Sequence, residues 1–191
     1  MGKQSKKIRR LLAENDYLIA PCAYDALSAR AIQASGFSIA GTTGYGMHGV
    51  VLGQPDTGLL ALNETVSILS KMVDAVDIPI LADAEGGYGS ALNVIRAVKE
   101  YEKTGVAGLF IEDQKQPPNC PFIKAPELIS TDEMVGKIEA AVATREDPDM
   151  VIIARTDAPF EEAIERANAY MEAGADMVKI LPKSRSGASG S

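Results

Sequence analysis

The segment 79–89, PILADAEGGYG, constrains the fold of this chain more than any other stretch. A short apolar run at 80–82 follows a proline and is typical of a buried parallel strand. The run ends in two acids two positions apart, Asp83 and Glu85, followed by a glycine-rich turn. Side chains at i and i+2 share one face of an extended chain, and ligands bind at the carboxyl ends of parallel strands. The segment therefore predicts a binding site on a parallel sheet.

The paired acids allow two interpretations. Two neighbouring carboxylates repel each other unless a cation lies near them, and ligation by oxygen alone suits Mg²⁺. Alternatively, Asp83 caps the following turn and Glu85 is solvated. A motif this short does not decide between the two.

The composition is that of a globular domain without a polyanion-binding surface. The chain has 191 residues, 46% of them hydrophobic, which is enough for one domain with a sizeable core. A net charge of −7, and the lack of aromatic residues beside the basic cluster, argue against nucleic acid as a partner. We expect that cluster to lie on the solvated face of a first helix. Its members are Lys3, Lys6, Lys7, Arg9 and Arg10.

Neither a membrane-spanning apolar run nor a signal-peptide pattern is found, so no membrane partner is expected. The two cysteines, Cys22 and Cys120, are far apart and lack a metal-binding spacing. We therefore expect reduced thiols and a cytoplasmic location.

Strand and helix patterns alternate along the whole chain. The expected strands are 17–22, 37–41, 80–82, 107–111, 150–154 and 176–181. The expected helices are 5–15, 25–35, 62–75, 91–103, 130–144 and 159–173, with Asp25, Asn63 and Ser130 or Thr131 as candidate caps. The segments 42–60 and 114–127 have no periodicity and are expected to be long functional loops.

Six βα units in series predict a parallel sheet with helices outside. Such a sheet either stays open, as in a doubly wound fold, or closes into a (β/α)₈ TIM barrel. No strand is followed by G-x-G-x-x-G or a Walker-type lysine. Polar residues end many strands, and a barrel brings all these ends to one mouth, so the barrel is favoured. The chain has only six of the eight βα units that a complete barrel needs. We expect a partial barrel over 1–183, with 184–191 a linker, tag or mobile tail.

Several motifs resemble the isocitrate lyase / phosphoenolpyruvate mutase superfamily across residues 18–181. They are YDALSARAIQASGF, TTGYGMHGVVLGQPDTGLL, LADAEGGYG, GLFIEDQ, ARTDA and GADMVKI. The resemblance implies a Mg²⁺-dependent barrel that makes or breaks C–C or P–C bonds in small 2-oxo or 2-hydroxy carboxylates through an enolate. It also implies two further strands and a terminal helix exchanged between subunits, hence a homo-oligomer.

The resemblance implies a set of site residues. Asp83 would be a direct metal ligand, while Glu85 and Glu112 would hold metal-bound water. Asp56 would be a catalytic loop acid, and Arg155 would both grip a substrate carboxylate and act in catalysis. The substrate-binding residues would be Tyr24, Thr43, Gly44, Tyr45 and Arg155.

One loop departs from the family pattern. Isocitrate and methylisocitrate lyases carry a K-[KR]-C-G-H loop with a cysteine acid/base, and Cys120 falls at that position without its basic pair or Gly-His. A thiol needs nearby cations to become a thiolate, so an inert Cys120 is somewhat favoured over a catalytic one. His48, the single histidine, either contacts substrate or is polar surface, with surface favoured.

Three functions stay open. The first is a lyase or mutase of this superfamily, with C–C cleavage or decarboxylation favoured over P–C chemistry. The second is an inactive homologue that still binds metal and oxo acid. The third is a partial or engineered barrel without activity.

Overall fold

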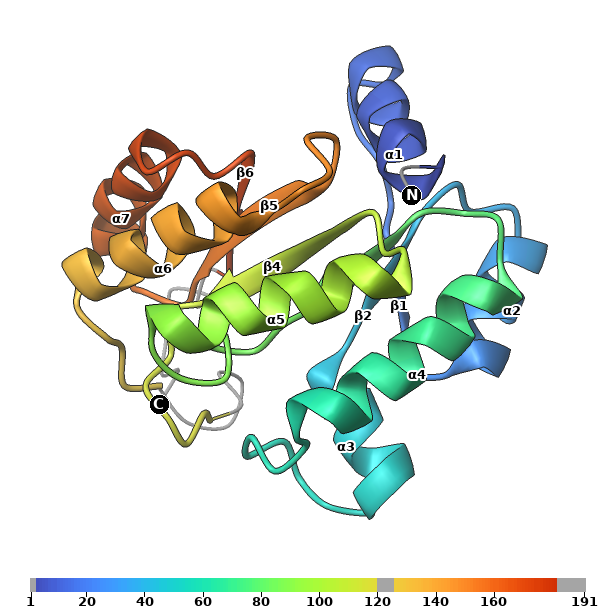
Figure 1. The fold of residues 1–191 in the computed structure, drawn as a ribbon, viewed down its shortest axis with the longest axis horizontal. Coiled ribbons are helices and arrows are strands. Elements are labelled where there is room, and N and C mark those ends of the chain that lie inside the picture. Colours follow the sequence, from blue (N-terminus) through green and yellow to red (C-terminus); the bar gives the residue numbers. More distant parts are fainter. Residues whose placement is uncertain (1–2, 120–125, 182–191) are drawn as a thin grey trace, which may run out of the picture.

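The computed structural model describes residues 3–119 and 126–181, and six parallel strands form its centre. The strands lie in chain order, from β1 to β6 (Figure 1). They are β1 Cys22–Ala23, β2 Ala40–Thr42, β3 Ile80–Asp83, β4 Gly108–Glu112, β5 Val151–Thr156 and β6 Met177–Ile180. A doubly wound sheet reverses its strand order at a switch point, whereas this sheet never reverses. The architecture is therefore the barrel type, present over part of its circumference.

The helices of the described residues are α1 Lys3–Glu14, α2 Ala26–Ala34, α3 Gly44–Leu52, α4 Leu62–Ala75, α5 Ala91–Thr104, α6 Thr131–Thr144 and α7 Phe160–Glu172. Five of them, α2 and α4 to α7, cover the outer face of the sheet, while α1 and α3 lie at its two ends. Consecutive crossover helices pack on one another, α2 on α4, α4 on α5, α5 on α6 and α6 on α7. This is the expected arrangement of helices around parallel strands.

The strands alternate between two apolar layers, as their period of two requires. Ile152 and Ala154 of β5 belong to the main core between the sheet and its helices. Val151 and Ile153 belong to a smaller core on the inner face. Arg155 follows at the next inward position, so a charged group lies where β5 reaches the mouth.

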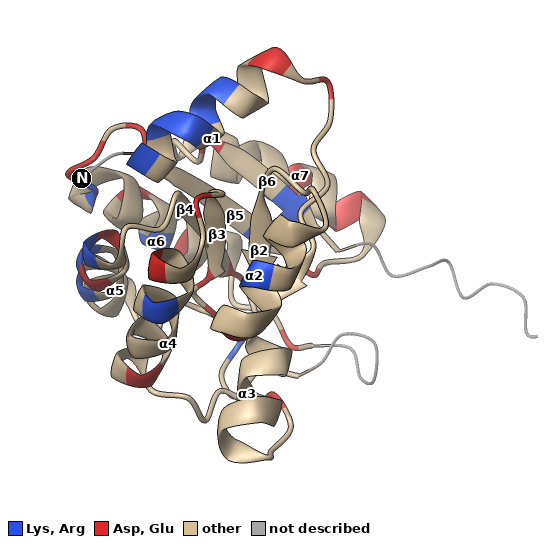
Figure 2. Ribbon diagram, turned by 90° about the vertical axis from the view of Figure 1, so that its right-hand side faces the viewer, with Lys and Arg blue, Asp and Glu red and all other residues tan. Residues whose placement is uncertain are grey.

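Helix α1 covers the opposite, amino-terminal end of the inner core. Ile8 is fully buried in the smaller core with Ile39 and Phe110. Arg9 donates to the carbonyl of Asp149 at 3.0 Å and pairs with Asp176 at 2.7 Å. Part of the basic face of α1 seen in Figure 2 thus docks the helix onto the barrel, and only the rest is solvated.

The structure differs from the sequence expectations at three places. The first strand is only Cys22–Ala23, because Tyr17 and Ile19 lie exposed without a strand partner. The segment 42–60 contains helix α3, capped by Thr43 and ended by Gly53 in the left-handed conformation. The glycines of this segment weaken the helical pattern, so the sequence did not predict α3. The prediction of Asn63 as a cap was wrong, because the N-cap of α4 is Ala61.

Other caps are confirmed. The Asp25 side chain accepts from Ser28 N at the start of α2, and Ser130 accepts from Glu133 N at the start of α6. None of the helices in the described ranges is both long and apolar enough to cross a bilayer.

Candidate active site

A cavity of about 450 Å³ opens at the carboxyl ends of the strands. It brings together residues from β1 to β6, from α3 and from the loops after α3 and β4. Its lining is Cys22, Thr42, Thr43, Gly44, Tyr45, Asp56, Asp83, Glu85, Glu112, Gln114, Pro118, Asn119, Arg155, Lys179 and Leu181. Eight residues that the sequence singled out are in this set, namely Thr43, Gly44, Tyr45, Asp56, Asp83, Glu85, Glu112 and Arg155.

Asp83 ends β3 and is held at the floor of the cavity. Its Oδ1 accepts from Glu85 N at 2.9 Å and its Oδ2 accepts from Gly44 N at 3.2 Å. Its own N–H donates to Thr42 Oγ1 at 2.7 Å, and its carbonyl accepts from Tyr101 at 2.8 Å. Asp83 therefore does cap the turn after β3, while its carboxylate still borders the cavity.

The interpretation of Glu85 as a solvated side chain was wrong. Glu85 is only partly exposed and has a φ of +51°, a conformation that non-glycine residues rarely adopt. Burial raises the pKa of Glu85 to about 10, and the negative charges of Asp83 and Asp56 add to the effect. Arg155 opposes this shift without cancelling it, so Glu85 keeps a proton at neutral pH when no metal ion is bound.

Gly44 makes room for this carboxylate at the start of α3. A Cβ at position 44 would lie 2.6 Å from Glu85 Oε1 and 3.1 Å from Asp56 Oδ2. Glu85, in the turn after β3, and Asp56, in the loop after α3, therefore approach each other over Gly44 because no side chain separates them.

His48 is fully buried in α3, so the surface interpretation of this histidine was wrong. Its Nε2 accepts from the backbone N–H groups of Leu59 and Leu60 at 3.0 and 3.2 Å. Nδ1 must then carry the proton, which it donates to the Gly44 carbonyl at 2.8 Å. His48 ties the start of α3 to the loop that carries Asp56.

The same histidine lies beside Asp56 but makes no hydrogen bond to its carboxylate. Ligand atoms of His48, Asp56 and Glu85 lie within 4.8 Å of one another, and His48 Nδ1 is 3.3 Å from Asp56 Oδ1. Both ring nitrogens of His48 already have partners, so the two carboxylates are the available ligands. Asp56 Oδ1 is buried with no hydrogen-bond partner among the described residues.

Arg155 lines the cavity between two acids, Glu112 and Asp157. It pairs with Glu112 at 2.9 Å and with Asp157 at 3.0 Å. Burial raises the pKa of Glu112 to about 8, even though Arg155 opposes the shift. For Arg155, burial is outweighed by Glu112 and Asp157, which raise the pKa of the guanidinium. Its charge is thus permanent and its orientation fixed.

A second layer supports this half of the site. Asp113 accepts from Thr156 Oγ1 at 2.7 Å, from Tyr170 at 2.9 Å and from Arg166 at 3.2 Å. Its other oxygen accepts from Asp157 N at 3.2 Å. Asp113 thereby joins the ends of β4 and β5 to α7 and positions the acid that orients Arg155.

Sequence reasoning missed Gln114, Cys22 and Lys179. Gln114 donates to Asp157 Oδ2 at 2.7 Å and accepts from Asn119 N at 2.9 Å, which holds the loop after β4 against the site. Lys179 interrupts an otherwise apolar strand, and that break in the pattern is the signal that would have found it. Cys22 carried no such signal.

Of the predicted site residues that the structure describes, Tyr24 alone is not in the lining of the cavity. Tyr24 is 39% exposed and packs its Cβ near Gly46 at the start of α3. Its contact with substrate stays a prediction. Cys120 lies outside the described residues, as do residues 184–191, so the expectations for both stay predictions.

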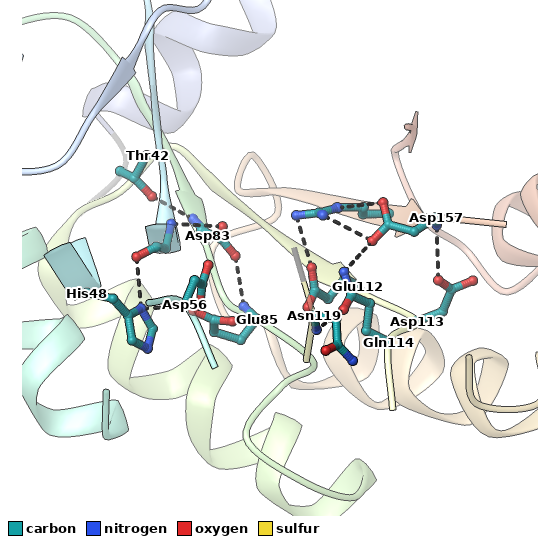
Figure 3. Close-up of polar contacts among 12 residues, drawn as sticks. Thr42, His48, Asp56, Asp83, Glu85, Glu112, Asp113, Gln114, Asn119 and Asp157 are labelled. Carbon is teal, nitrogen blue, oxygen red and sulfur yellow. Dashed lines mark hydrogen bonds and ion pairs between the residues drawn. The ribbon is translucent and has the colours of Figure 1, made fainter. Parts of the chain in front are cut away.

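The donor set fits Mg²⁺. Asp56, Asp83, Glu85 and Glu112 offer carboxylate oxygens only, which is the ligand type that Mg²⁺ prefers. The buried, unpaired Asp56 Oδ1 and the raised pKa values of Glu85 and Glu112 are what carboxylates clustered without their cation would show. Figure 3 shows Asp56, Asp83 and Glu85 grouped beside His48, with Glu112 facing them.

Comparison with known proteins agrees with this arrangement. The family model for phosphoenolpyruvate phosphomutase matches residues 8–187. The chain is 48% identical over 178 residues to 2,3-dimethylmalate lyase of Eubacterium barkeri, covering 91% of this chain and 62% of that protein. The chain thus spans about three fifths of the length of this relative.

Solved structures show the same fold. Oxaloacetate acetylhydrolase in complex with its product oxalate superposes with a TM-score of 0.84 at 38% identity, covering 92% of this chain and 62% of that one. Phosphonopyruvate hydrolase in complex with oxalate and Mg²⁺ superposes with a TM-score of 0.83 at 32% identity, covering 97% and 65%. With its motifs, sheet order and family match in agreement, this chain belongs to the phosphoenolpyruvate mutase/isocitrate lyase superfamily.

Proposed function

We propose that this protein is a Mg²⁺-dependent lyase or mutase that acts on a small 2-oxo or 2-hydroxy carboxylate through an enolate intermediate. We favour C–C cleavage or decarboxylation over P–C chemistry. The observation that carries the proposal is that four carboxylates and Arg155 line one cavity together. The similarity to a dimethylmalate lyase and an oxaloacetate acetylhydrolase supports the choice of C–C chemistry.

Asp83, Glu85 and Glu112 would hold the metal, with Asp56 beside them. Mg²⁺, when bound, supplies positive charge that offsets negative charge developing on a substrate oxygen. Two acids with raised pKa values would give up their protons as the metal binds, because ligands must be deprotonated.

Arg155 would orient the substrate carboxylate. Its guanidinium is already fixed by Glu112 and Asp157, so little side-chain entropy is lost on binding. Preorganised charge of this kind stabilises a transition state without further rearrangement.

Of the predicted substrate-binding residues 43–45, two already use their backbone N–H groups within the protein. Thr43 N donates to the Ala23 carbonyl at 3.2 Å, and Gly44 N donates to Asp83 Oδ2 at 3.2 Å. The backbone N–H of Tyr45 lies in the first turn of α3, where N–H groups lack an intrahelical acceptor, and would meet an anionic ligand. Proton transfer by Cys120 stays a prediction, because its segment is outside the described residues.

The decisive experiment measures Mg²⁺-dependent release of pyruvate or CO₂ from oxaloacetate, methylisocitrate, dimethylmalate and phosphonopyruvate, with oxalate as inhibitor. Turnover that oxalate blocks supports the proposal, and the responding substrate defines the reaction. Oxalate binding without turnover would point to the inactive homologue, and no oxalate binding would point to a partial barrel without activity.

Two further expectations remain proposals. We propose that the protein forms a homo-oligomer, because β1 and β6 each pair with a neighbour on one side only among the described residues. The cytoplasmic location rests on cysteine usage and composition alone.

A further inference from the structure

Lys179 is a cation of the cavity that no carboxylate of the described residues pairs with directly. Its side chain lies in the lining, from β6. Among the residues that the structure describes, none of the ion pairs includes Lys179. Its Nζ instead lies 3.9 Å from the centroid of the Phe110 ring, a cation–π contact that positions the ammonium without neutralising it.

The sheet register places this ammonium at one end of a row. Glu112 pairs with Arg155, and Arg155 pairs with Lys179, on three neighbouring strands. Neighbouring strands lie about 4.8 Å apart, so Lys179 stands roughly 10 Å across the sheet from Glu112. Glu112 and Lys179 therefore stand on either side of Arg155 in the lining of the cavity.

The two cations differ in how much charge they offer a ligand. Arg155 already pairs with Glu112 and Asp157, so much of its charge is compensated. Lys179 makes no direct ion pair among the described residues, and Asp83 and Asp157 act on its charge only from beyond ion-pair distance. Burial lowers the pKa of Lys179, and the neighbouring Arg155 adds to this effect. A bound anion would therefore stabilise the charged form of Lys179.

We propose that Lys179 binds a second, remote carboxylate of the ligand and so favours dicarboxylates long enough to reach it, such as malate, over monocarboxylates and over the short dicarboxylate oxalate. The inference rests on the proposed function, because it assumes that one carboxylate end is held on the side of Asp83 and Arg155. A ligand with carboxylates at both ends then reaches across the cavity to Lys179, whereas a monocarboxylate leaves this ammonium unpaired.

The test compares malate with lactate, which share a 2-hydroxy carboxylate end and differ in the remote carboxylate. Calorimetry in Mg²⁺ gives the dissociation constants of both, and of oxalate, for wild type and for Lys179→Met. We expect Lys179→Met to weaken malate about tenfold or more, as loss of a charged hydrogen bond does, and to leave lactate and oxalate unchanged. Lys179→Arg should restore the preference for malate.

Lys103→Met is the matched control, because Lys103 is exposed on α5 and pairs with Glu100 at 2.8 Å. It should change none of the three affinities. If wild type binds oxalate but Lys179→Met keeps the ratio of malate to lactate affinity, the inference is wrong while the proposed function stands. If Lys179→Met weakens oxalate equally, its effect is general and the inference is also wrong. Failure of wild type to bind oxalate contradicts both.

Discussion

Asp83 is the residue on which the metal site depends most directly. Both its oxygens are fixed by backbone N–H groups, so the carboxylate is preorganised at the meeting point of β3 and α3. We expect Asp83→Ala to abolish Mg²⁺ binding in a calorimetric titration, whereas Glu85→Asp keeps most of the affinity because a carboxylate remains. Asp74→Ala, at an exposed position of α4, is the control. Unchanged Mg²⁺ affinity in Asp83→Ala would overturn the metal assignment.

Glu85 makes the stability of the metal-free protein depend on pH. Its folded-state pKa of about 10 lies above the ordinary value of 4.5, so the folded state binds its proton more tightly than the unfolded state. The resulting stabilisation is complete below about pH 4.5 and is lost as pH rises toward 10. The free energy of unfolding should therefore fall with pH, by up to about 1.4 kcal/mol per pH unit for one group.

Glu85→Gln removes this titration while keeping the shape of the side chain. Denaturant unfolding in EDTA at about pH 6 and about pH 9 should show a smaller loss of stability in the variant than in wild type. Glu112, with a pKa of about 8, leaves part of the decline in place. An equal decline in both proteins would mean that Glu85 is not the group responsible.

At the scale of elements, the start of α3 lets Asp56, in the loop after α3, approach Glu85, in the turn after β3. Gly44→Ala places a methyl group 2.6 Å from Glu85 Oε1, so the carboxylate must move. We expect Mg²⁺ affinity to fall about tenfold or more, since metal sites tolerate little displacement of a supporting group.

Gly49→Ala is a matched control on the same helix, because a Cβ there meets nothing within 4 Å. It should keep Mg²⁺ affinity and raise stability by about 0.5–1 kcal/mol, the helix preference of alanine over glycine. Equal Mg²⁺ affinity in both variants would show that the clearance at Gly44 is not required.

At the scale of the whole molecule, the sheet formed by the described residues has two edges. Strands β1 and β6 lie at its ends, and the exposed Ile19 and Ile180 add apolar surface near them. Unpaired edges and apolar surface favour association, so we expect light scattering to give at least twice the 20.2 kDa mass of one chain. A stable monomer in dilute solution would contradict this prediction.

The sequence by itself determined the order and kind of most elements and the charged groups at the strand ends. Apolar runs such as 80–82 and capping residues such as Asp25 and Ser130 are local signals, because they depend on neighbours within one turn or strand. The acids that follow β3 and β4 were readable for the same reason.

Only the tertiary structure decided what those groups do to one another. The burial of His48, the clearance over Gly44 and the row formed by Glu112, Arg155 and Lys179 all join segments distant in sequence. Helix α3 escaped prediction because its glycines weaken a helical pattern that capping by Thr43 and tertiary packing stabilise. Strand register and burial set distances and pKa values, and neither is encoded in any local pattern of residues.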